Sequence, residues 1–545
     1  MRVAATLADV VELMTQRSGG LTFIDGDLAE RRLGYGELAA SARSVAAGLQ
    51  SRGVRPGDRV GLIGRTSPEL VIGLFGAWSA GAVPVILPLL RRRQLQDVQR
   101  RIDQIGAHIL LVEISIKDAL PSMNGTAVAS VSSLPLVGRV GEGVSKPDDL
   151  ALLQFTSGST AHPRAVGLSH RQVLHHVRSL GTAVGATHKD VWVSWLPLYH
   201  DMGLIWMIGA VVMGATMVLE PPEDFLNRPS SWLDAVSKYG GTGTVGPNFA
   251  FDLARRDLEL NPRRLDLSAL RVVCAGAEPI KLETLESFIA LTEQLGLSRT
   301  ALCPAYGLAE ATVAVTISRP DQPLTSYVVD RDGLGAMDEV RRVEVASPTA
   351  RTLVSCGPPI PGTEIQILDA DGDSRDRWRV GEIAVRSPSV MMQYWSEPQA
   401  TAEVLRDGWL RTGDLGFLTD DGELVVCGRL KDMIIVGGHN IYPEEYEAVA
   451  ESTAGVRPYG TIAFALPERE RMVLVVEMRH ATTDPDELAR RVLLKVRDET
   501  GYAPGELVMV RAGSLPKTSS GKKQRALCRD LYLSERLPVL ASVRR

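Results

Sequence analysis

LQFTSGSTAHPRAV, residues 153–166, is an apolar strand-like stretch that runs into a loop of hydroxyl residues, one glycine and one basic side chain. Backbone N–H groups and hydroxyls in such a turn can surround a polyphosphate, and Arg164 would add positive charge. The spacing of a Walker loop is absent. A run of Ser, Thr and Gly is equally typical of an ordinary turn. By itself the stretch therefore leaves a phosphate-binding loop and a plain turn as alternatives.

The residues before this loop alternate between strand and helix patterns. RVGLIG (59–64) reads as a strand, and it precedes a helix for which Ser67 is a good N-cap and Pro68 a good first residue. AVPVIL (82–87) reads as the next strand, and a second round of the pattern ends in a helix beginning at Ser169. Short strand–helix–strand connections predict an α/β fold with a parallel sheet covered on both faces.

The pattern changes in the second half of the chain. From about residue 351 to 430, short strands separated by Gly and Pro turns predict a small antiparallel sheet or β-barrel. After GRLKD (428–432), helices expected at 443–451 and 484–499 and three intervening or following strands predict a small α+β domain. Segment 317–350 is polar and irregular enough to be an insertion.

The length, net charge and cysteine content exclude several classes of protein. The 545 residues allow two to four domains at roughly 150 residues each. A net charge of -5 argues against a dedicated nucleic-acid binder. The five cysteines are widely spread without a CxxC pair, which excludes a zinc ribbon and a disulfide framework and suits a reducing compartment. We therefore expect a cytoplasmic protein.

One uncharged stretch, GLIWMIGAVVMGATMVL (203–219), resembles a membrane span. Its 17 residues are at the lower limit for crossing a bilayer, and glycines and alanines divide it into a helix and a strand. Asp201 and Glu220 flank it, and no Lys/Arg cluster marks an inner face. The sequence therefore predicts buried core and no membrane span.

Further motifs combine apolar strands with chemically useful side chains. WLPLYHDMGLI (195–205) places His200 and Asp201 between two apolar runs, although such a histidine is commonly structural. CAGAEP (274–279) is a strand end followed by a turn of small residues, against which a flat ring could lie. PAYGLAEAT (304–312) offers an aromatic ring, a glycine and a carboxylate.

Two more motifs lie nearer the C-terminus. RTGDLG (411–416) predicts a tight turn holding Asp414, whose carboxylate could accept both hydroxyls of a ribose. A turn-forming aspartate is the plain alternative. SLPKTSSGKKQR (514–525) reads as a glycine-hinged basic loop in which Lys517 and Lys523 are expected to be solvated.

These motifs follow one another over about 370 residues, and in this order the chain resembles adenylate-forming enzymes, the superfamily of acyl-CoA synthetases, luciferases and non-ribosomal adenylation domains. LLQFTSGST, WLPLYHDMGLI, GPNFAFDL, CAGAEP and PAYGLAEATVAV resemble most closely the fatty acyl-AMP ligases. The resemblance covers essentially the whole chain. It implies a large N-terminal domain (1–430) of two parallel-sheet subdomains and a small β-barrel, and a mobile α+β C-terminal domain (431–545) with its hinge at Lys431.

The resemblance also implies a reaction with ATP and Mg²⁺. A carboxylate would attack the α-phosphate, giving an acyl-adenylate and pyrophosphate. The phosphopantetheine thiol of a separate acyl carrier protein would then take the acyl group, in polyketide, peptide or lipid biosynthesis. Segment 317–350 matches an insertion that restrains the C-terminal domain and disfavours free CoA, and a surface loop without a function is the plain alternative. From residue 507 onward nine Lys/Arg face two Asp/Glu, a tail that would dock an acidic carrier or simply be solvated.

Site residues carry over from the family by position. The phosphate loop matches Thr156, Ser157, Gly158, Ser159 and Thr160, and the adenine pocket matches Gly276, Ala277, Glu278, Tyr306 and Gly307. Glu310 matches the magnesium carboxylate, an oxygen ligand suited to a hard cation. Asp414 matches the ribose clamp and Arg429 a second ribose or phosphate contact. His200 borders the acyl site, and Lys522 matches the catalytic lysine of the C-terminal loop.

Several positions depart from the family pattern, among them Gly437 and the run ILPLLRRR that follows AVPV. Ala165 stands where glycine is usual, Arg164 where lysine is common, and His439 where fatty acyl-AMP ligases more often have arginine. Arginine keeps the charge at position 164 but presents a planar fork in place of a point charge. The identity and chain length of the acid stay open, as does the acceptor. Free CoA would make the chain an acyl-CoA synthetase, an amine is another possible acceptor, and a third alternative is a catalytically silent nucleotide-binding interaction module.

Overall fold

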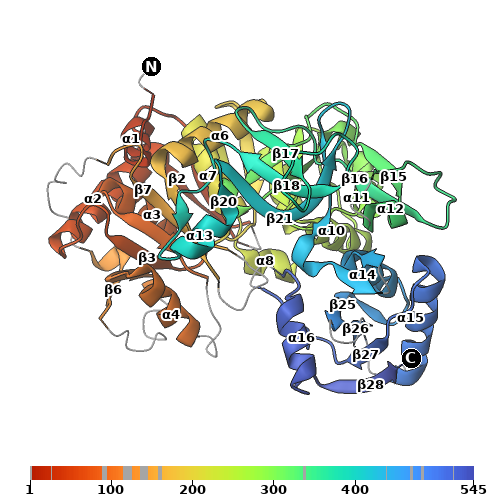
Figure 1. Cartoon of the computed structure of the whole chain (residues 1–545). Coiled ribbons are helices and arrows are strands. Elements are labelled where there is room, and N and C mark those ends of the chain that lie inside the picture. Colours follow the sequence, from red (N-terminus) through yellow and green to blue (C-terminus); the bar gives the residue numbers. More distant parts are fainter. Residues whose placement is uncertain are drawn as a thin grey trace.

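The computed structural model describes residues 3–25, 28–88, 95–114, 125–134, 145–156, 163–335, 339–436, 439–466, 471–479, 484–518 and 521–544. It has a large part made of several sheets and a small C-terminal part (Figure 1). This is the α/β fold that the sequence predicts, with a large N-terminal and a smaller C-terminal domain.

The largest sheet has eight strands in the order β14-β13-β12-β11-β9-β10-β1-β2. Its strands are β1 (Gly20–Ile24), β2 (Glu30–Gly34), β9 (Val191–Ser194), β10 (Thr216–Leu219), β11 (Gly243–Gly246), β12 (Val272–Ala275), β13 (Leu302–Gly307) and β14 (Ala314–Ile317). All pairings from β1 through β13 are parallel, and only the two edge strands run antiparallel. The carboxyl ends of β9 to β13 therefore share one edge, where ligands bind in open α/β sheets.

A second parallel sheet has the order β4-β3-β5-β6. It consists of β3 (Arg59–Ile63), β4 (Val83–Ile86), β5 (Ile109–Val112) and β6 (Ala127–Ser130). Between β3 and β4 lies α3 (Pro68–Ser79), whose N-cap Ser67 accepts a hydrogen bond from the Leu70 amide. The predicted strand–helix–strand unit is thus confirmed. A three-stranded antiparallel sheet of β7 (Leu150–Phe155), β8 (Ala165–Ser169) and β19 (Gln393–Tyr394) adjoins it.

Helices cover these sheets and bury a common core. The helices of the large part are α1 (Leu7–Met14), α2 (Tyr35–Ser51), α4 (Leu95–Ile105), α6 (His170–Ala183), α7 (Asp201–Met213), α8 (Pro222–Asn227), α9 (Ser231–Tyr239), α10 (Asn248–Leu260), α11 (Leu282–Thr292) and α13 (Pro398–Val404). The uncharged stretch 203–219 forms most of α7 and all of β10, largely buried, as the sequence predicts. No helix among the described residues is long and apolar enough to cross a membrane.

A fourth sheet, all antiparallel, follows from residue 364 and is the curled sheet of the fold. It contains β17 (Glu364–Leu368), β18 (Gly381–Arg386), β20 (Leu405–Arg406), β21 (Trp409–Leu418) and β22 (Leu424–Arg429). This antiparallel sheet confirms the small antiparallel sheet or β-barrel that the sequence predicts for about residues 351–430.

The segment 317–350 is more regular than the sequence indicated. β15 (Ser326–Asp330) pairs with β16 (Ala350–Val354) in a two-stranded antiparallel sheet, and α12 (Arg331–Gly335) follows β15 directly. The expectation of an irregular segment is wrong, because Val329 and Leu334 are buried with Phe417 and Val425 of the curled sheet in a small separate core.

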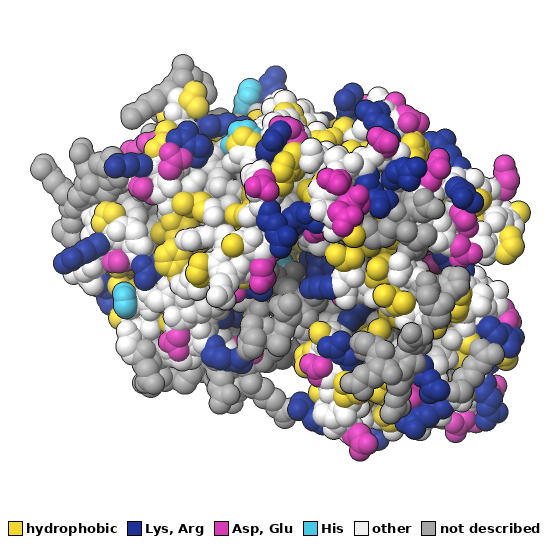
Figure 2. Space-filling view, in the orientation of Figure 1, with side chains coloured by type: hydrophobic (Ala, Val, Ile, Leu, Met, Phe, Trp, Pro, Cys, Tyr) yellow, Lys and Arg dark blue, Asp and Glu magenta, His cyan; other side chains and the backbone are white. Residues whose placement is uncertain are grey.

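The C-terminal part has a four-stranded sheet in the order β25-β26-β27-β28. Its elements are β23 (Ile434–Val436), β24 (His439–Ile441), α14 (Pro443–Glu451), β25 (Val456–Leu466), β26 (Arg471–Met478), α15 (Pro485–Thr500), β27 (Glu506–Val510), α16 (Arg525–Leu533) and β28 (Val539–Arg544). The predicted helices and strands are confirmed to within a few residues. Figure 2 shows this part as a smaller mass that carries many Lys and Arg side chains on its outer side.

All five cysteines are free thiols in the interior. Burial raises the pKa of Cys303, Cys356, Cys427 and Cys528 to about 12, and it raises the pKa of Cys274 as well. No disulfide framework holds the fold, as the sequence predicts.

Candidate active site

The predicted site residues gather at the carboxyl edge of the eight-stranded sheet. Gly276, Ala277 and Glu278 follow β12 directly, and Tyr306 and Gly307 end β13. The peptide chain is tight here, because a Cβ on Gly276 would lie 2.9 Å from the Ala305 carbonyl oxygen. Ala277 has a φ of +68°, a left-handed conformation that is uncommon for a residue other than glycine. The turn thus presents its backbone, with little side-chain bulk, to the edge of the sheet.

Tyr306, Asp414 and Arg429 form one hydrogen-bonded group. The Tyr306 hydroxyl donates to Oδ2 of Asp414 over 2.7 Å, and Nε of Arg429 donates to Oδ1 over 2.9 Å. The charge of Asp414 raises the pKa of Arg429, and burial followed by that same charge raises the pKa of Tyr306. Each carboxylate oxygen of Asp414 keeps a second lone pair for a further donor.

Asp414 does not lie in a tight turn, so that expectation is wrong. It sits inside the ten-residue strand β21, where it is paired in register with Arg429 of β22. The glycine before it, at φ +70°, and a register shift after Leu415 distort the strand locally. Such a bulge aims a strand side chain in a particular direction, here toward the edge of the neighbouring sheet that holds Tyr306.

Glu310 is held by a residue that the sequence did not single out. Its Oε1 accepts a hydrogen bond of 2.7 Å from the hydroxyl of Tyr394, which lies in β19. Burial raises the pKa of Glu310, although the Tyr394 hydrogen bond and the charge of Arg429 oppose the rise. The sequence gives little indication of this partner, because Tyr394 lies 84 residues from Glu310 along the chain, in a short edge strand.

Arg164 approaches the same tyrosine from the phosphate-loop side. Its guanidinium lies 5.0 Å from the Tyr394 ring centroid, and Nε is 3.2 Å from Oε2 of Glu397. The planar arginine therefore stacks and pairs in a way that a lysine would not reproduce. Ala165, the second departure, is a fully buried residue of β8.

Only the two ends of the predicted phosphate loop can be located. The Thr156 amide donates to the Arg164 carbonyl over 2.8 Å, and the Arg164 amide donates back to Oγ1 of Thr156 over 3.2 Å. These bonds close the loop at its base. Ser157, Gly158, Ser159 and Thr160 lie outside the described residues, as does the side chain of His439.

His200 and Asp201 begin α7 just beyond β9. Nδ1 of His200 is 3.8 Å from Oδ1 of Asp201, and both side chains are largely buried. Burial alone would raise the pKa of Asp201, but its contact with His200 and the charge of Lys522 outweigh burial, so the pKa is lowered. Asp201 is thus a second acidic group of the site that the sequence did not assign a role.

Lys522 reaches this group from the C-terminal part. Two hydrogen bonds join the ends of its loop: the Thr518 amide donates to the Lys522 carbonyl over 2.8 Å, and the Lys522 amide donates to Oγ1 of Thr518 over 3.0 Å. Burial and the charge of Arg429 lower the pKa of Lys522, while Asp201, Glu278 and Asp414 oppose that change. The charge of Lys522 therefore interacts with those of the site residues of the large part, and a Cβ on the neighbouring Gly521 would lie 3.9 Å from the Phe249 ring of α10.

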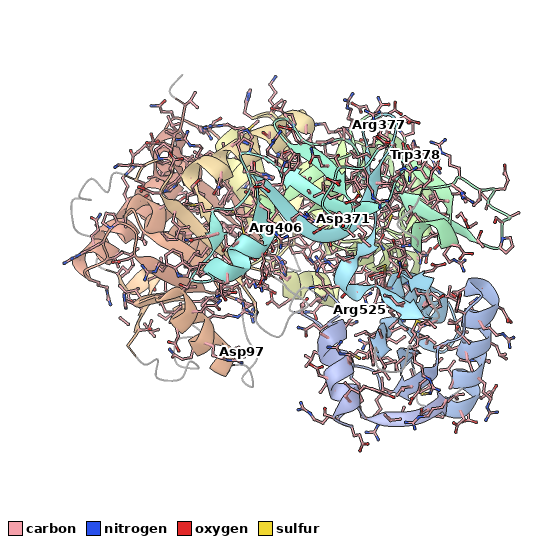
Figure 3. The ribbon with its side chains drawn as sticks, viewed as in Figure 1. Asp97, Asp371, Arg377, Trp378, Arg406 and Arg525 are labelled. Atoms are coloured by element: carbon pink, nitrogen blue, oxygen red, sulfur yellow. The ribbon has the colours of Figure 1, made fainter. Side chains whose placement is uncertain are left out.

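The residues that follow Lys522 are anchored by buried carboxylates. Nζ of Lys523 lies 2.8 Å from both Glu447 and Glu451, and Arg525 pairs with Glu447 and Asp432 at 3.0 Å. Arg525 lies where the two parts of the molecule meet (Figure 3). The expectation that Lys523 is a solvated surface lysine is therefore wrong, because two carboxylates of α14 bind it. These contacts fix the base of the Lys522 loop.

Carboxylate oxygens at this edge fit a hard cation. Glu310 offers a carboxylate that Tyr394 orients, and Mg²⁺ in phosphate sites usually takes one or two protein carboxylates with the remaining ligands from phosphates and water. In the described ranges no group of three or more His, Cys, Asp or Glu side chains is arranged to hold a metal. The donor set thus fits a magnesium ion held mainly through a bound nucleotide.

The fold and this site define the class of adenylate-forming enzymes. Residues 15–395 match the family model described as AMP-binding enzyme. The medium-chain fatty acid–acyl-carrier-protein ligase JamA of Moorena producens is 34% identical over 545 aligned positions, which cover 93% of this chain and 91% of that protein.

Two solved structures extend the likeness to the whole fold. A chain from a study of fatty acyl-adenylate ligases of E. coli and L. pneumophila superposes with a TM-score of 0.91 at 32% identity, covering 97% of this chain and 98% of that one. The L. pneumophila fatty acyl-adenylate ligase in complex with acyl adenylate and pyrophosphate gives 0.76 at 30% identity, covering 99% and 98%. The chain belongs to the AMP-binding enzyme family and is a fatty acyl-AMP ligase-like enzyme that uses ATP.

Proposed function

We propose that the enzyme activates a fatty carboxylic acid with ATP to give an acyl-adenylate and pyrophosphate, and then passes the acyl group to the phosphopantetheine thiol of a separate acyl carrier protein. The observation that carries the proposal is the position of Lys522. The charge of this lysine, which belongs to the C-terminal part, interacts with the charges of Asp201, Glu278, Asp414 and Arg429 of the large part. That arrangement suits a reaction in which negative charge develops between a carboxylate and a phosphate.

The nucleotide would bind along the carboxyl edge of the sheet. The adenine ring would lie against the Gly276–Glu278 turn and Tyr306, where small residues leave flat backbone exposed to it. The ribose hydroxyls would donate to Asp414, whose orientation Tyr306 and Arg429 already fix. The phosphates would be bound by the loop that begins at Thr156, with Gly307 beside the base.

Glu310 is the proposed magnesium carboxylate, with its orientation set by the Tyr394 hydroxyl. When bound, Mg²⁺ would neutralise phosphate charge. Lys522 would stabilise the charge that builds up as a carboxylate oxygen attacks the α-phosphate and pyrophosphate leaves. His200 would border the acyl group beside the reacting carboxylate, held at the start of α7 with Asp201 next to it.

A contact between segment 317–350 and the C-terminal part supports the choice of acceptor. Arg331 donates to the carbonyl oxygens of Thr500 (2.6 Å) and Glu499 (3.3 Å), and its Nε lies 2.5 Å from Oε1 of Glu445. The Tyr442 hydroxyl donates to the Leu334 carbonyl over 3.1 Å. We call these contacts the clamp.

The clamp would restrain the C-terminal part beside its junction with the large part. The Arg331 and Glu445 side chains are each only 14% exposed, so breaking the pair would leave a charge in a poorly hydrated place. A restrained C-terminal part disfavours capture of a freely diffusing thiol and favours a thiol delivered by a docked protein. The similarity to JamA also supports a carrier protein as the acceptor, because JamA is named as a ligase that joins fatty acids to an acyl carrier protein.

We also propose that the mobile domain comprises residues 431–545, with Lys431 as its hinge and 1–430 as the N-terminal domain. Lys431 lies in a single 3₁₀ turn, Leu430–Asp432, between β22 and β23. A short turn between two sheets is the kind of place that absorbs a change of backbone angles. Five free buried thiols agree with a cytoplasmic location, which we propose as well.

Product analysis tests the proposed function. Purified protein would be incubated with Mg-ATP and a pooled panel of carboxylic acids, with free CoA or a holo carrier protein in parallel reactions, and the products identified by mass spectrometry. We expect an acyl-adenylate whose acyl group moves to the carrier protein and not to CoA. Formation of acyl-CoA would overturn the choice of acceptor, and the absence of any adenylate, with ATP bound, would favour the catalytically silent alternative.

A further inference from the structure

A tyrosine of the C-terminal part docks on the large part beside the Lys522 loop. The Tyr459 hydroxyl donates to Oδ2 of Asp252 over 3.1 Å, and its ring meets the Phe249 ring edge to face with centroids 6.3 Å apart. Asp252 and Phe249 both belong to α10. Arg255 and Arg256 of the same helix donate to Oδ1 of Asp252, so the carboxylate that receives Tyr459 is held in one orientation.

The backbone at Tyr459 is unusual. Its φ is +57°, and it lies where β25 changes register against β26 between Val456 and Thr461. Glycine or asparagine adopts such a conformation far more readily than an aromatic residue. A strained position that carries a large side chain is best explained by what the side chain reaches, and here it reaches α10.

A pair of charges crosses between the two parts next to Tyr459. Nζ of Lys281 is 3.4 Å from Oε2 of Glu451, and it lies 5.8 Å from the Tyr459 ring centroid. The other oxygen of Glu451 is 2.8 Å from Nζ of Lys523, the residue after Lys522. Glu451 therefore links the Lys522 loop to Lys281, three residues beyond the proposed adenine turn.

Phe249 joins these contacts to the site itself. Its amide donates to Oε1 of Glu278 over 2.6 Å. A Cβ placed on Gly521 would lie 3.9 Å from the Phe249 ring, so the Lys522 loop passes over it. The Phe249 ring thus lies next to the loop and packs against Tyr459, while the Phe249 amide holds a residue of the adenine turn.

We propose that Tyr459, Lys281 and Glu451 are positioning residues that hold Lys522 in the site during formation of the acyl-adenylate and are not needed for the later transfer of the acyl group. We call these three residues the latch. The inference rests on the proposed function, because it assigns the latch to the first of the two half-reactions. None of the three touches a reacting atom; each acts through the Lys522 loop.

The separation between half-reactions follows from the chemistry. A cation stabilises the transition state at the α-phosphate only when it is held within hydrogen-bond distance, and a misplacement of about 1 Å is costly. In the second half-reaction the thiol sulfur bonds to the acyl carbon, the bond from that carbon to the phosphate oxygen breaks, and AMP and the thiol proton are released. The proposed rotation about Lys431 has by then carried the Lys522 loop away from the leaving phosphate, so this step does not depend on it. Loosening the latch should therefore slow the first step and spare the second.

The test compares both half-reactions in a graded set of variants. Tyr459→Phe removes only the hydroxyl, and Tyr459→Gly removes the whole side chain while keeping a residue at ease with positive φ. We expect adenylate formation, measured by ATP–pyrophosphate exchange, to fall about threefold in the first and about tenfold in the second. The fall should appear in kcat with KM for ATP within about twofold. Transfer from preformed acyl-adenylate to the carrier thiol should stay unchanged.

Matched variants distinguish a role of the latch residues in positioning Lys522 from a general role in folding. Tyr532→Phe is the control, since its hydroxyl donates to Glu506 over 2.8 Å wholly within the C-terminal part, and both half-reactions should match wild type. Lys281→Ala should slow adenylation, and Lys281→Arg should restore it by keeping the charge opposite Glu451. Equal losses in both half-reactions, or an unchanged Tyr459→Gly enzyme, would overturn the latch alone. A wild-type enzyme that forms no adenylate would overturn the proposed function and the latch with it.

Discussion

The C-terminal part meets the rest of the molecule at two places that differ in construction. In the clamp, Arg331 donates to two backbone carbonyls and pairs with Glu445, and both side chains are 14% exposed. In the latch, one hydroxyl and one longer ion pair make the contact, and Lys281 is 34% exposed. The clamp is the tighter of the two, because its ion pair is 2.5 Å long against 3.4 Å in the latch and its arginine also binds two backbone carbonyls.

The proposed roles of the two contacts explain the difference. The clamp would restrain the C-terminal part throughout the reaction, whereas the latch would hold Lys522 only for the first half-reaction. A contact that persists through a conformational change can be strong, whereas a contact that must break is better made of weak bonds.

The largest expected effect lies at the latch end, in Lys522→Ala. Loss of this cation should reduce adenylate formation by ~10²–10³ because the developing charge loses its preorganised partner. Pyrophosphate exchange measures the first half-reaction, and transfer from supplied acyl-adenylate measures the second, which should survive. Lys238→Ala is a suitable control, since that lysine donates to the Leu28 carbonyl and lies over the Tyr239 ring on the surface. Wild-type exchange in Lys522→Ala would contradict the assigned mechanism.

Arg331→Ala tests the clamp end and should have a smaller effect of opposite sign. Release of the C-terminal part should raise acyl transfer to free CoA by about tenfold, equivalent to about 1.4 kcal/mol, while adenylation stays within about threefold. Thioester formation with CoA is the measurement. Arg299→Ala, which breaks an exposed pair with Glu293 at 2.8 Å, should leave CoA transfer as it was. If Arg331→Ala and Arg299→Ala transfer the acyl group to CoA at the same rate, the clamp does not determine which acceptor the enzyme uses.

Alkaline pH should lower the rate of adenylation several-fold, an effect that belongs to the Lys522 side of the interface and not to the clamp. Lys522 must be protonated to act, and burial, followed by the charge of Arg429, lowers its pKa below the usual 10.5. Adenylation should therefore decline as pH rises through that lowered pKa, at a lower pH than an ordinary lysine would give. In Lys522→Arg the residual rate should show no such decline, because arginine stays charged. A rate profile from pH 7 to 10 decides, and identical profiles would contradict this role.

Glu445→Gln should produce the smallest change, about a threefold rise in CoA transfer. The amide cannot pair with Arg331, but the two carbonyl acceptors of the clamp remain. Because burial raises the pKa of Glu445, mild acid should weaken the wild-type pair in the same direction. CoA transfer measured from pH 8 to 6 should rise in wild type and stay flat in Glu445→Gln. A parallel rise in both would assign the effect elsewhere.

Local patterns in the sequence predicted much of the fold. Ser67 and Pro68 start a helix, and helix 443–451 was predicted to the residue. Contiguous motifs likewise predicted the Gly276–Glu278 turn. What failed depended on distant partners. Asp414 was expected in a turn, but its strand conformation is set by pairing with β22.

Long-range contacts also carry the site residues that the sequence did not reveal. Tyr394 orients Glu310 from 84 residues away, and Tyr459 reaches Asp252 across 207 residues. Nothing in a single strand's pattern of apolar residues specifies such partners. The regular structure of segment 317–350 was not predicted for the same reason, since Val329 and Leu334 are buried against the curled sheet, which lies elsewhere in the sequence.

The five interior thiols have a practical consequence for watching the C-terminal part move. Maleimides and similar reagents attack thiolates, and groups with pKa values near 12 behind packed side chains react very slowly. A single Leu533→Cys substitution on exposed α16 would then carry a fluorophore selectively in the folded enzyme. The chain is already suited to site-specific labelling without removal of its native cysteines.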